Sequence, residues 1–358
     1  MNKRQFIKFT TLLASGGMFF PLSSRSEENL VQETKTACQP SNLIMVNPEN
    51  TILRWKDLCV GQDWTKAFDA AAQWGKSIGG ATIFIPKGIY NAQITLVENV
   101  YWVGEGRGVT IITQQPNENR DIVKSDLFDS LTGIGPLKNA PKNFGLLNLT
   151  IDGNYLTDYH QSFSEPGTGY NNRKGYGIKI FGSKFSLDLE LVNCPEIGLY
   201  IEGVDYKGYT DEQDSKIYIS GRVFGKEGII HRGPADIIFT HVYLGCVGWK
   251  ATIKERNSAI VMSDVYPGEP VHAMVADEKK IGSLSYNGHH EFGILHLYGN
   301  YNGYGYKSMS SGRIKGEQLI CENCRGGVYF SEKSWGIISI IDCHNNGRIG
   351  SDVKSTSD

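Results

Sequence analysis

Short apolar runs, each bounded by glycine, asparagine or aspartate, recur along the chain from residue 81 onward. The runs are too short for helices and recur too regularly for loops, which indicates strands. We therefore predict strands at Ala81–Ile85, Val100–Val103, Leu146–Ile151, Gly177–Ile180, Leu187–Val192, Gly198–Ile201, Ile237–Phe239 and Gly336–Ile341.

One earlier segment, residues 63–78, has the spacing of a helix instead. Asp63 can cap its first turn, and the pair Gly79-Gly80 ends it. We predict one amphipathic helix here, because apolar side chains recur on a single face at helical intervals. These side chains are Ala67, Phe68, Ala71, Ala72, Gly75 and Ile78.

A unit made of a strand, a turn pair and a cysteine repeats with a period of about 20 to 30 residues. A coil of about two dozen residues cannot bury its own apolar face, so stacked coils must supply the missing partner. The cysteine that ends each unit then fits an interior stack, as a small apolar group rather than a metal ligand or a disulfide. The clearest copies are Leu189–Cys194, His241–Cys246, Leu319–Cys324 and Ser339–Cys343.

The predicted fold is therefore all-β, a parallel β-helix (solenoid) spanning residues 51–358. The helix 63–78 covers the N-terminal edge of its sheets, which would otherwise be exposed. Residues 155–174 form a loop insertion. Insertions in a solenoid gather on one face, often the binding face, although a mobile surface loop explains this one equally well.

The start of the predicted solenoid carries a family likeness. Asp63–Ala71 followed by Gly79–Tyr90 resembles the opening of pectate-lyase-like β-helix proteins, in which a capping helix leads into Gly-Gly-Gly-x-Val-x-Phe-Pro-x-Gly-x-Tyr. Val100–Ile112 and Leu147–Asn154 are similar to the next landmarks. The resemblance covers residues 55–205 closely and implies a right-handed helix. The superfamily includes lyases, hydrolases, epimerases, tailspikes and exopolysaccharide-cluster proteins, so the fold does not settle the function.

The N-terminal segment has the pattern of an export signal. The charged stretch Asn2–Lys8 precedes a short apolar stretch, Phe9–Leu22, which predicts a signal peptide at residues 1–24. It resembles a twin-arginine signal, but Lys3 replaces the first arginine and leaves the ordinary secretory route open. Residues 25–50 are expected to be a linker. We expect a periplasmic or secreted protein with no stable membrane span after signal removal; the alternative is an uncleaved tether.

Charge and cysteine content narrow the choice of partners. The formal net charge is −2, which disfavours nucleic acid as a partner. Cys321 and Cys324 form a Cys-x-x-Cys, but no second pair or histidine set completes a zinc site. The acidic residues are too scattered to define a metal site, so no cofactor is expected; calcium is possible but not indicated.

Two triplets resemble part of the polygalacturonase motif set. Gly288-His289-His290 and Arg313-Ile314-Lys315 stand where that family has Gly-His-Gly and Arg-Ile-Lys. No Asp-Asp or Asn-Thr-Asp precedes them at coil spacing, and hydrolysis needs two facing carboxyl groups. Three-residue matches also arise by chance.

A lyase needs other groups. β-Elimination from a uronate requires a cation that neutralises the carboxylate and a base that takes the α-proton. In a β-helix such groups point outward from stacked strands. If Ile230 is buried, His231 faces out, and the same alternation places Lys250 and His272 outside on the following coils. We predict His231, Lys250 and His272 as catalytic, although an error of one residue in strand phase would invert the assignment.

The neighbours of this line are the expected substrate-binding residues. Arg232 and Lys254 add positive charge, which suits an anionic sugar chain. Tyr200 and Glu202 face outward one coil earlier, where the tyrosine ring can stack on a sugar. The competing interpretation is that all of them are solvated residues on an exposed face.

We therefore expect an exported enzyme acting on an acidic polysaccharide, a lyase in the first place and a glycoside hydrolase in the second. The alternatives are a non-catalytic carbohydrate-binding or scaffold protein for exopolysaccharide assembly or export, and a C5-epimerase, which shares the proton-abstraction step.

Overall fold

The computed structural model describes residues 50–115, 118–126, 128, 140–154, 175–202, 215–223, 227–232, 236–245, 259–263, 289–299, 303–309, 312–346 and 353–355. The predicted signal peptide, the linker up to residue 49 and the loop insertion lie outside these residues and stay predictions.

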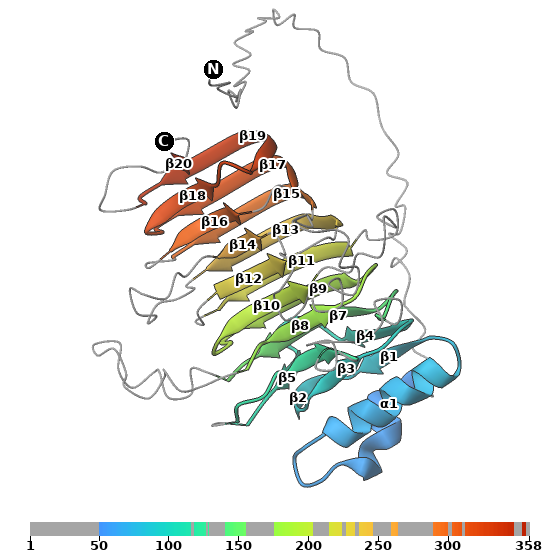
Figure 1. The fold of residues 1–358 in the computed structure, drawn as a ribbon. Helices are drawn as coiled ribbons and strands as arrows, with labels where there is room; N and C mark the ends of the chain where they lie inside the picture. The colour runs from blue at the N-terminus through green and yellow to red at the C-terminus, as the bar shows by residue number, and fades with distance from the viewer. Residues whose placement is uncertain are drawn as a thin grey trace, which may run out of the picture. The chain divides into compact units, whose positions relative to one another are not determined.

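Two long parallel sheets make up the body of the protein (Figure 1). The first, called sheet A, has 11 strands. Its main path runs through β1 (Ala81–Ile85), β4 (Val100–Gly104), β7 (Gly145–Asp152), β9 (Ser186–Val192), β11 (Ser215–Arg222), β13 (Asp236–Gly245), β15 (His289–Tyr298), β17 (Arg313–Glu322) and β19 (Trp335–His344). Beside that path, β2 (Gly88–Asn91) pairs with β5 (Thr110–Thr113), and β5 pairs with β7.

The second sheet, called sheet B, has nine strands. In chain order they are β3 (Ile94–Leu96), β6 (Val123–Ser125), β8 (Ile178–Phe181), β10 (Ile197–Glu202), β12 (Glu227–Arg232), β14 (Ile260–Ser263), β16 (Tyr304–Met309), β18 (Gly326–Phe330) and β20 (Val353–Ser355).

From β6 onward the chain passes from one sheet to the other with each coil, and every strand pairs in parallel with strands of the neighbouring coils. Register partners lie one coil apart: His290 pairs with Ile314, and Ile314 pairs with Gly336. This is a right-handed parallel β-helix, and the predicted fold is confirmed.

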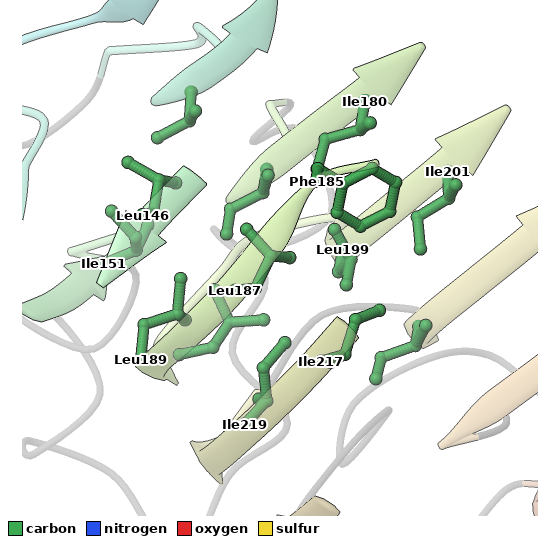
Figure 2. Close-up of a cluster of buried hydrophobic side chains, with 14 of the residues drawn as sticks. Leu146, Ile151, Ile180, Phe185, Leu187, Leu189, Leu199, Ile201, Ile217 and Ile219 are labelled. Carbon is green, nitrogen blue, oxygen red and sulfur yellow. The ribbon is translucent and has the colours of Figure 1, made fainter. Parts of the chain in front are cut away.

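The core is a continuous apolar column between the sheets. Figure 2 shows side chains from both sheets meeting there, with Leu187, Leu189 and Ile219 from sheet A opposite Leu199 and Ile201 from sheet B. Leu187 and Leu189 pair in register with residues of β7 and β11, so like side chains stack from coil to coil. Every one of these five is almost fully buried. The stacking gives each coil the apolar partner that a coil of this length cannot supply by itself.

Asparagines in the left-handed region make the turns between strands. Asn193, Asn323 and Asn345 have φ values of 53°, 53° and 54°, a conformation that asparagine tolerates better than most residues. The Asn193 amide donates to the Arg222 carbonyl one coil away, at 3.0 Å. Cys194 follows the first of these turns and is fully buried, as expected of an interior stacking residue.

The predicted helix is α1 (Thr65–Ser77), preceded by the 3₁₀ helix η2 (Ile52–Leu58). The N-cap position is Trp64, and the carboxylate of Asp63, one residue earlier, accepts the Thr65 amide of the first turn at 2.9 Å. Phe68 is buried against Trp102, with ring centroids 5.2 Å apart. Ile78 was predicted on this buried face; it follows the helix and is 56% exposed. Of the described helices, none combines the length and apolar character that crossing a membrane requires.

Candidate functional site

The outer face of sheet B brings together three of the residues singled out from the sequence. On β10, Leu199 and Ile201 point into the core, so Tyr200 and Glu202 point outward as predicted. On β12 the register partner of Glu202 is Arg232. Tyr200, Glu202 and Arg232 therefore lie on two adjacent coils.

The predicted orientation of His231 is wrong. Its side chain is 1% exposed and lies in the interior, whereas Ile230 is only half-buried on the outer face. The assumed phase of β12 was shifted by one residue, which exchanges inward and outward positions. His231 therefore cannot contact a substrate on this face. Lys250, Lys254 and His272 lie outside the described residues, and their roles stay predictions.

Hydrogen bonds join the three outward residues into one cluster. The Tyr200 hydroxyl donates to Oε1 of Glu202. Nη1 of Arg232 donates to the Tyr200 oxygen at 3.5 Å. Among the described residues, no donor reaches the buried Oε2 of Glu202. A buried carboxyl oxygen without a donor is costly unless a ligand supplies one.

Lys179 belongs to the same cluster and was missed in the sequence. It pairs in register with Tyr200 from the neighbouring strand β8. Its Nζ lies 4.4 Å from the centre of the Phe128 ring and 5.0 Å from that of Tyr176, and 3.7 Å from the Asp121 carboxylate. Alternation could have identified it, because Lys179 stands between two apolar residues of a predicted strand.

Aromatic rings surround the tyrosine of the cluster. The Tyr200 ring lies 5.6 Å from that of Tyr176 and 6.2 Å from that of Phe128, measured between centroids. Phe128 forms a small apolar cluster outside the main core, together with Ala140 and Phe181, and Tyr200 packs against it. The phenol and the carboxyl are therefore held in a largely apolar environment.

This environment changes the acid–base properties of the cluster. Burial raises the pKa of Glu202 to about 7, although the hydrogen bond from Tyr200 and the charges of Arg232 and Lys179 act in the opposite direction. Burial, together with the neighbouring Glu202, raises the pKa of Tyr200 far above its ordinary value. A carboxyl that titrates near neutrality beside two cations is an arrangement typical of catalytic sites.

The partial polygalacturonase likeness belongs to the other sheet. His290 is fully buried in the interior, and its register partner is Ile314. Arg313 and Lys315 lie on the outer face of sheet A, where each approaches the Glu291 carboxylate to 3.5 Å. These triplets therefore form exposed ion pairs and an interior imidazole. Across the described parts of the chain, no group of three or more His, Cys, Asp or Glu could hold a metal ion.

Sequence comparison finds relatives over part of the chain only. The chain is 32% identical to the mannuronan C5-epimerase AlgE5 of Azotobacter vinelandii over 101 residues, which are 26% of this chain and 9% of that protein. It is 31% identical to AlgE3, another mannuronan C5-epimerase of that organism, over 147 residues, 38% of this chain and 7% of that protein. The chain thus spans less than a tenth of either relative. No protein-family model matches it.

Solved structures found in the comparison include two enzymes and a viral protein. The A-module of the Azotobacter vinelandii mannuronan C-5 epimerase AlgE4 has a TM-score of 0.36 and 13% identity, covering 86% of this chain and 99% of that one. The pectin methylesterase PemA of Erwinia chrysanthemi has a TM-score of 0.32 and 10% identity, covering 86% and 88%. ORF18 of Geobacillus virus E2 has a TM-score of 0.44 and 13% identity, covering 86% and 59%. With TM-scores below 0.5, these similarities decide neither the fold nor the chemistry of this chain.

The described residues confirm the parallel β-helix that the sequence predicts. The coils of parallel strands, the capping helix and the interior stacks are those expected from the sequence.

Proposed function

We propose that this protein is an exported enzyme that removes the C5 proton of a uronate residue in an acidic polysaccharide, with C5-epimerisation as the main outcome. The observation that carries the proposal is the outward cluster of Tyr200, Glu202, Arg232 and Lys179 on three consecutive strands of sheet B.

Arg232 and Lys179 are suited to bind the substrate carboxylate. A carboxylate on C6 disfavours removal of the neighbouring C5 proton, because the carbanion would place a second negative charge beside the first. Two cations facing one carboxylate neutralise that charge and stabilise the transition state. Arg232 can also hold a carboxylate with two parallel hydrogen bonds, which fixes the sugar ring.

Glu202 is suited to take the proton, and Tyr200 is suited to orient its carboxyl. With its pKa near 7, Glu202 is ionised in a useful fraction at neutral pH and remains basic enough to accept a proton. Its Oε2, which no described residue donates to, is the atom that would take it once the sugar displaces the groups that bury this oxygen. The Tyr200 hydroxyl donates to Oε1 and orients the carboxyl, and the proton that returns to C5 from the opposite face comes from water.

Epimerisation and elimination share this first step and then diverge. In epimerisation only the C5–H bond breaks, and a proton returns to C5 from the opposite face. In β-elimination the C4–O bond also breaks, a C4–C5 double bond forms, and the leaving oxygen takes a proton. Epimerisation is preferred because the matched relatives are mannuronan C5-epimerases. The lyase predicted from the sequence is the second candidate, and the same residues support it.

The proposal is tested with the purified full chain and a panel of polymannuronate, polyguluronate and polygalacturonate in D₂O. Nuclear magnetic resonance detects epimerised residues and deuterium at C5, and ultraviolet absorbance detects unsaturated uronate. The variants Glu202→Gln, Tyr200→Phe and Arg232→Gln should each lose activity by about a hundredfold or more. Glu317→Gln, an exposed site on β17, is the matched control.

Each measurement distinguishes one candidate function from the others. Deuterium at C5 without unsaturation supports the epimerase, and unsaturated ends support the lyase. New reducing ends without unsaturation would indicate a hydrolase. Tight binding with no chemical change on any polymer would leave the scaffold function and overturn the enzymatic proposal.

A further inference from the structure

A chain of hydrogen-bonded side chains crosses the interior of the β-helix behind the candidate site. Nδ1 of His231 on β12 lies 2.7 Å from Nε2 of His290 on β15. Nδ1 of His290 lies 2.9 Å from the hydroxyl of Tyr306 on β16, and that hydroxyl lies 3.7 Å from Sδ of Met262 on β14. This hydrogen-bonded chain therefore runs from sheet B to sheet A and back to sheet B.

Aromatic rings and apolar groups enclose this hydrogen-bonded chain. The imidazoles of His231 and His290 stack with centroids 5.0 Å apart and planes 19° from parallel. The Phe239 ring meets His290 edge-on at 4.9 Å. The titratable groups that act on His290 are the imidazoles of His231 and His289, and Tyr306 donates or accepts at its Nδ1. Burial, with both neighbouring imidazoles, holds the pKa of His290 well below its ordinary value.

Apolar side chains occupy the same interior positions on the adjacent coils. His231 pairs in register with Ile201 and Met262, and His290 pairs with Ile237 and Ile314. The interior thus accepts an isoleucine or a methionine at either position. Buried polar groups are costly, and replacing a buried polar pair by well-packed apolar residues is often neutral or stabilising. Packing alone therefore does not account for the two histidines.

A polar bridge can instead define one arrangement of the strands. Hydrogen bonds have fixed lengths and directions, whereas apolar contacts allow small slips and rotations. Arg232 is the residue after His231 and lies on the opposite face of β12. Any slip or rotation of β12 that breaks the bridge therefore moves the guanidinium away from the Tyr200 oxygen.

We infer that His231 and His290 are positioning residues for the candidate site: their bridge fixes β12 against sheet A and thereby holds Arg232 beside Tyr200. This inference rests on the proposed function, to which it adds two residues that touch no substrate. His231 thus takes part through the interior of the protein and not through the outer face where the sequence placed it.

The test replaces the bridge by apolar residues, in the double variant His231→Leu/His290→Ile. Phe292→Leu, an interior change on the same strand as His290, is the matched control. The titration of the Glu202 carboxyl is followed by ¹³C resonance in labelled protein, with Glu202→Gln identifying the signal. KM, kcat and the unfolding temperature are measured on the same proteins.

The double variant is expected to fold with an unchanged or higher unfolding temperature. Its Glu202 should titrate at higher pH than in the native protein, because the Arg232 charge has moved away. KM should rise on the order of tenfold with a smaller change in kcat, since substrate binding loses a cation. The control should leave the Glu202 titration unchanged. If the double variant does not fold, the same readings are taken on His231→Met.

An unchanged Glu202 titration and KM in a folded bridge variant would overturn the inference. The two proposals fail separately. A native protein that modifies no uronate polymer loses the proposed function, while the Glu202 titration still reports whether the bridge holds Arg232. Recovery of the native titration in His290→Gln, which can still donate and accept, would support a hydrogen-bonded bridge over a purely steric one.

Discussion

A carboxyl group that is 1% exposed, as in Glu202, loses most of its hydration on folding, and Arg232 and Lys179 restore only part of that loss. Burial therefore favours the protonated form in the folded protein. Between the ordinary value of 4.5 and the folded value of about 7, the folded state binds more protons than the unfolded state. Stability accordingly falls as the pH rises through this window.

We predict that Glu202→Gln stabilises the protein at pH 8 and has little effect at pH 4. Glutamine resembles the protonated carboxyl and removes the cost of ionisation, which is on the order of 1 to 3 kcal/mol at pH 8. Urea unfolding at the two pH values measures the difference, with Glu317→Gln as the control. A destabilised variant at pH 8 would show that the carboxylate is held by more contacts than those described here.

Close packing at a single atom gives a second prediction. A Cβ placed on Gly305 would lie 2.5 Å from Sγ of Cys321. Gly305→Ala should therefore cost about 1 to 3 kcal/mol of unfolding free energy. Cys321→Ala removes the sulfur, so the double variant should lose less than the sum of the single losses. Strict additivity in urea unfolding would contradict this packing.

The phase of a strand decides which site residues the sequence reveals. In β10, apolar and polar residues alternate strictly from Leu199 to Glu202, and the outward pair was predicted correctly. In β12, Ile229 and Ile230 are both apolar, so the pattern fits either phase, and His231 was placed on the wrong face. The hydrogen bonds within the cluster depend on which coils are neighbours, and the irregular lengths of the connecting loops hide that from the sequence.

At the scale of elements, α1 closes the N-terminal end of the stack. Its buried face covers the first coil, where the Phe68 ring meets Trp102 of β4 at 5.2 Å and Tyr90 at 6.1 Å. Helical spacing and the Gly79-Gly80 stop made this element predictable, and only Ile78 was misplaced. Each solenoid coil is stabilised by its neighbours, so damage to the capping helix should destabilise the nearest strands first.

We predict that Phe68→Ala costs about 3 to 5 kcal/mol, because it opens a cavity under the cap. Amide hydrogen exchange should lose protection in β1 and β4 before it does in β15 and β17. Lys66→Ala, an exposed change on the same helix, is the control. Equal loss of protection along both sheets would mean that the stack unfolds as one cooperative unit.

At the scale of the whole molecule, the interior must stay uncharged. In the described coils it is filled with apolar side chains, apart from the bridge of His231 and His290 and a few hydrogen-bonded polar groups. The pKa of His290 is depressed in the folded protein. At pH values below the ordinary pKa of 6.5, this imidazole therefore binds a proton in the unfolded chain but not in the folded protein. Stability from this group is present above pH 6.5 and is lost as the pH falls.

We predict that His231→Leu/His290→Ile reduces the loss of stability between pH 7 and pH 5, by up to about 2 kcal/mol. The comparison is made in Glu202→Gln protein, because Glu202 acts in the opposite direction over the same window. Thermal unfolding at both pH values measures it. An identical pH dependence with and without the histidines would show that the pair is not the acid-sensitive element.

The direction of the hydrogen bonds has a mechanical consequence. The backbone bonds that join coils run along the stack, from the α1 end to the β19 end (Figure 1). A pull between residues 50 and 346 therefore loads one coil at a time, as in opening a zipper, rather than shearing many bonds together. Near the C-terminal end, 24 residues separate His290 from Ile314 and 22 separate Ile314 from Gly336. Each detached coil there should lengthen the tether by about 75 to 85 Å, giving a saw-tooth force trace that counts the coils.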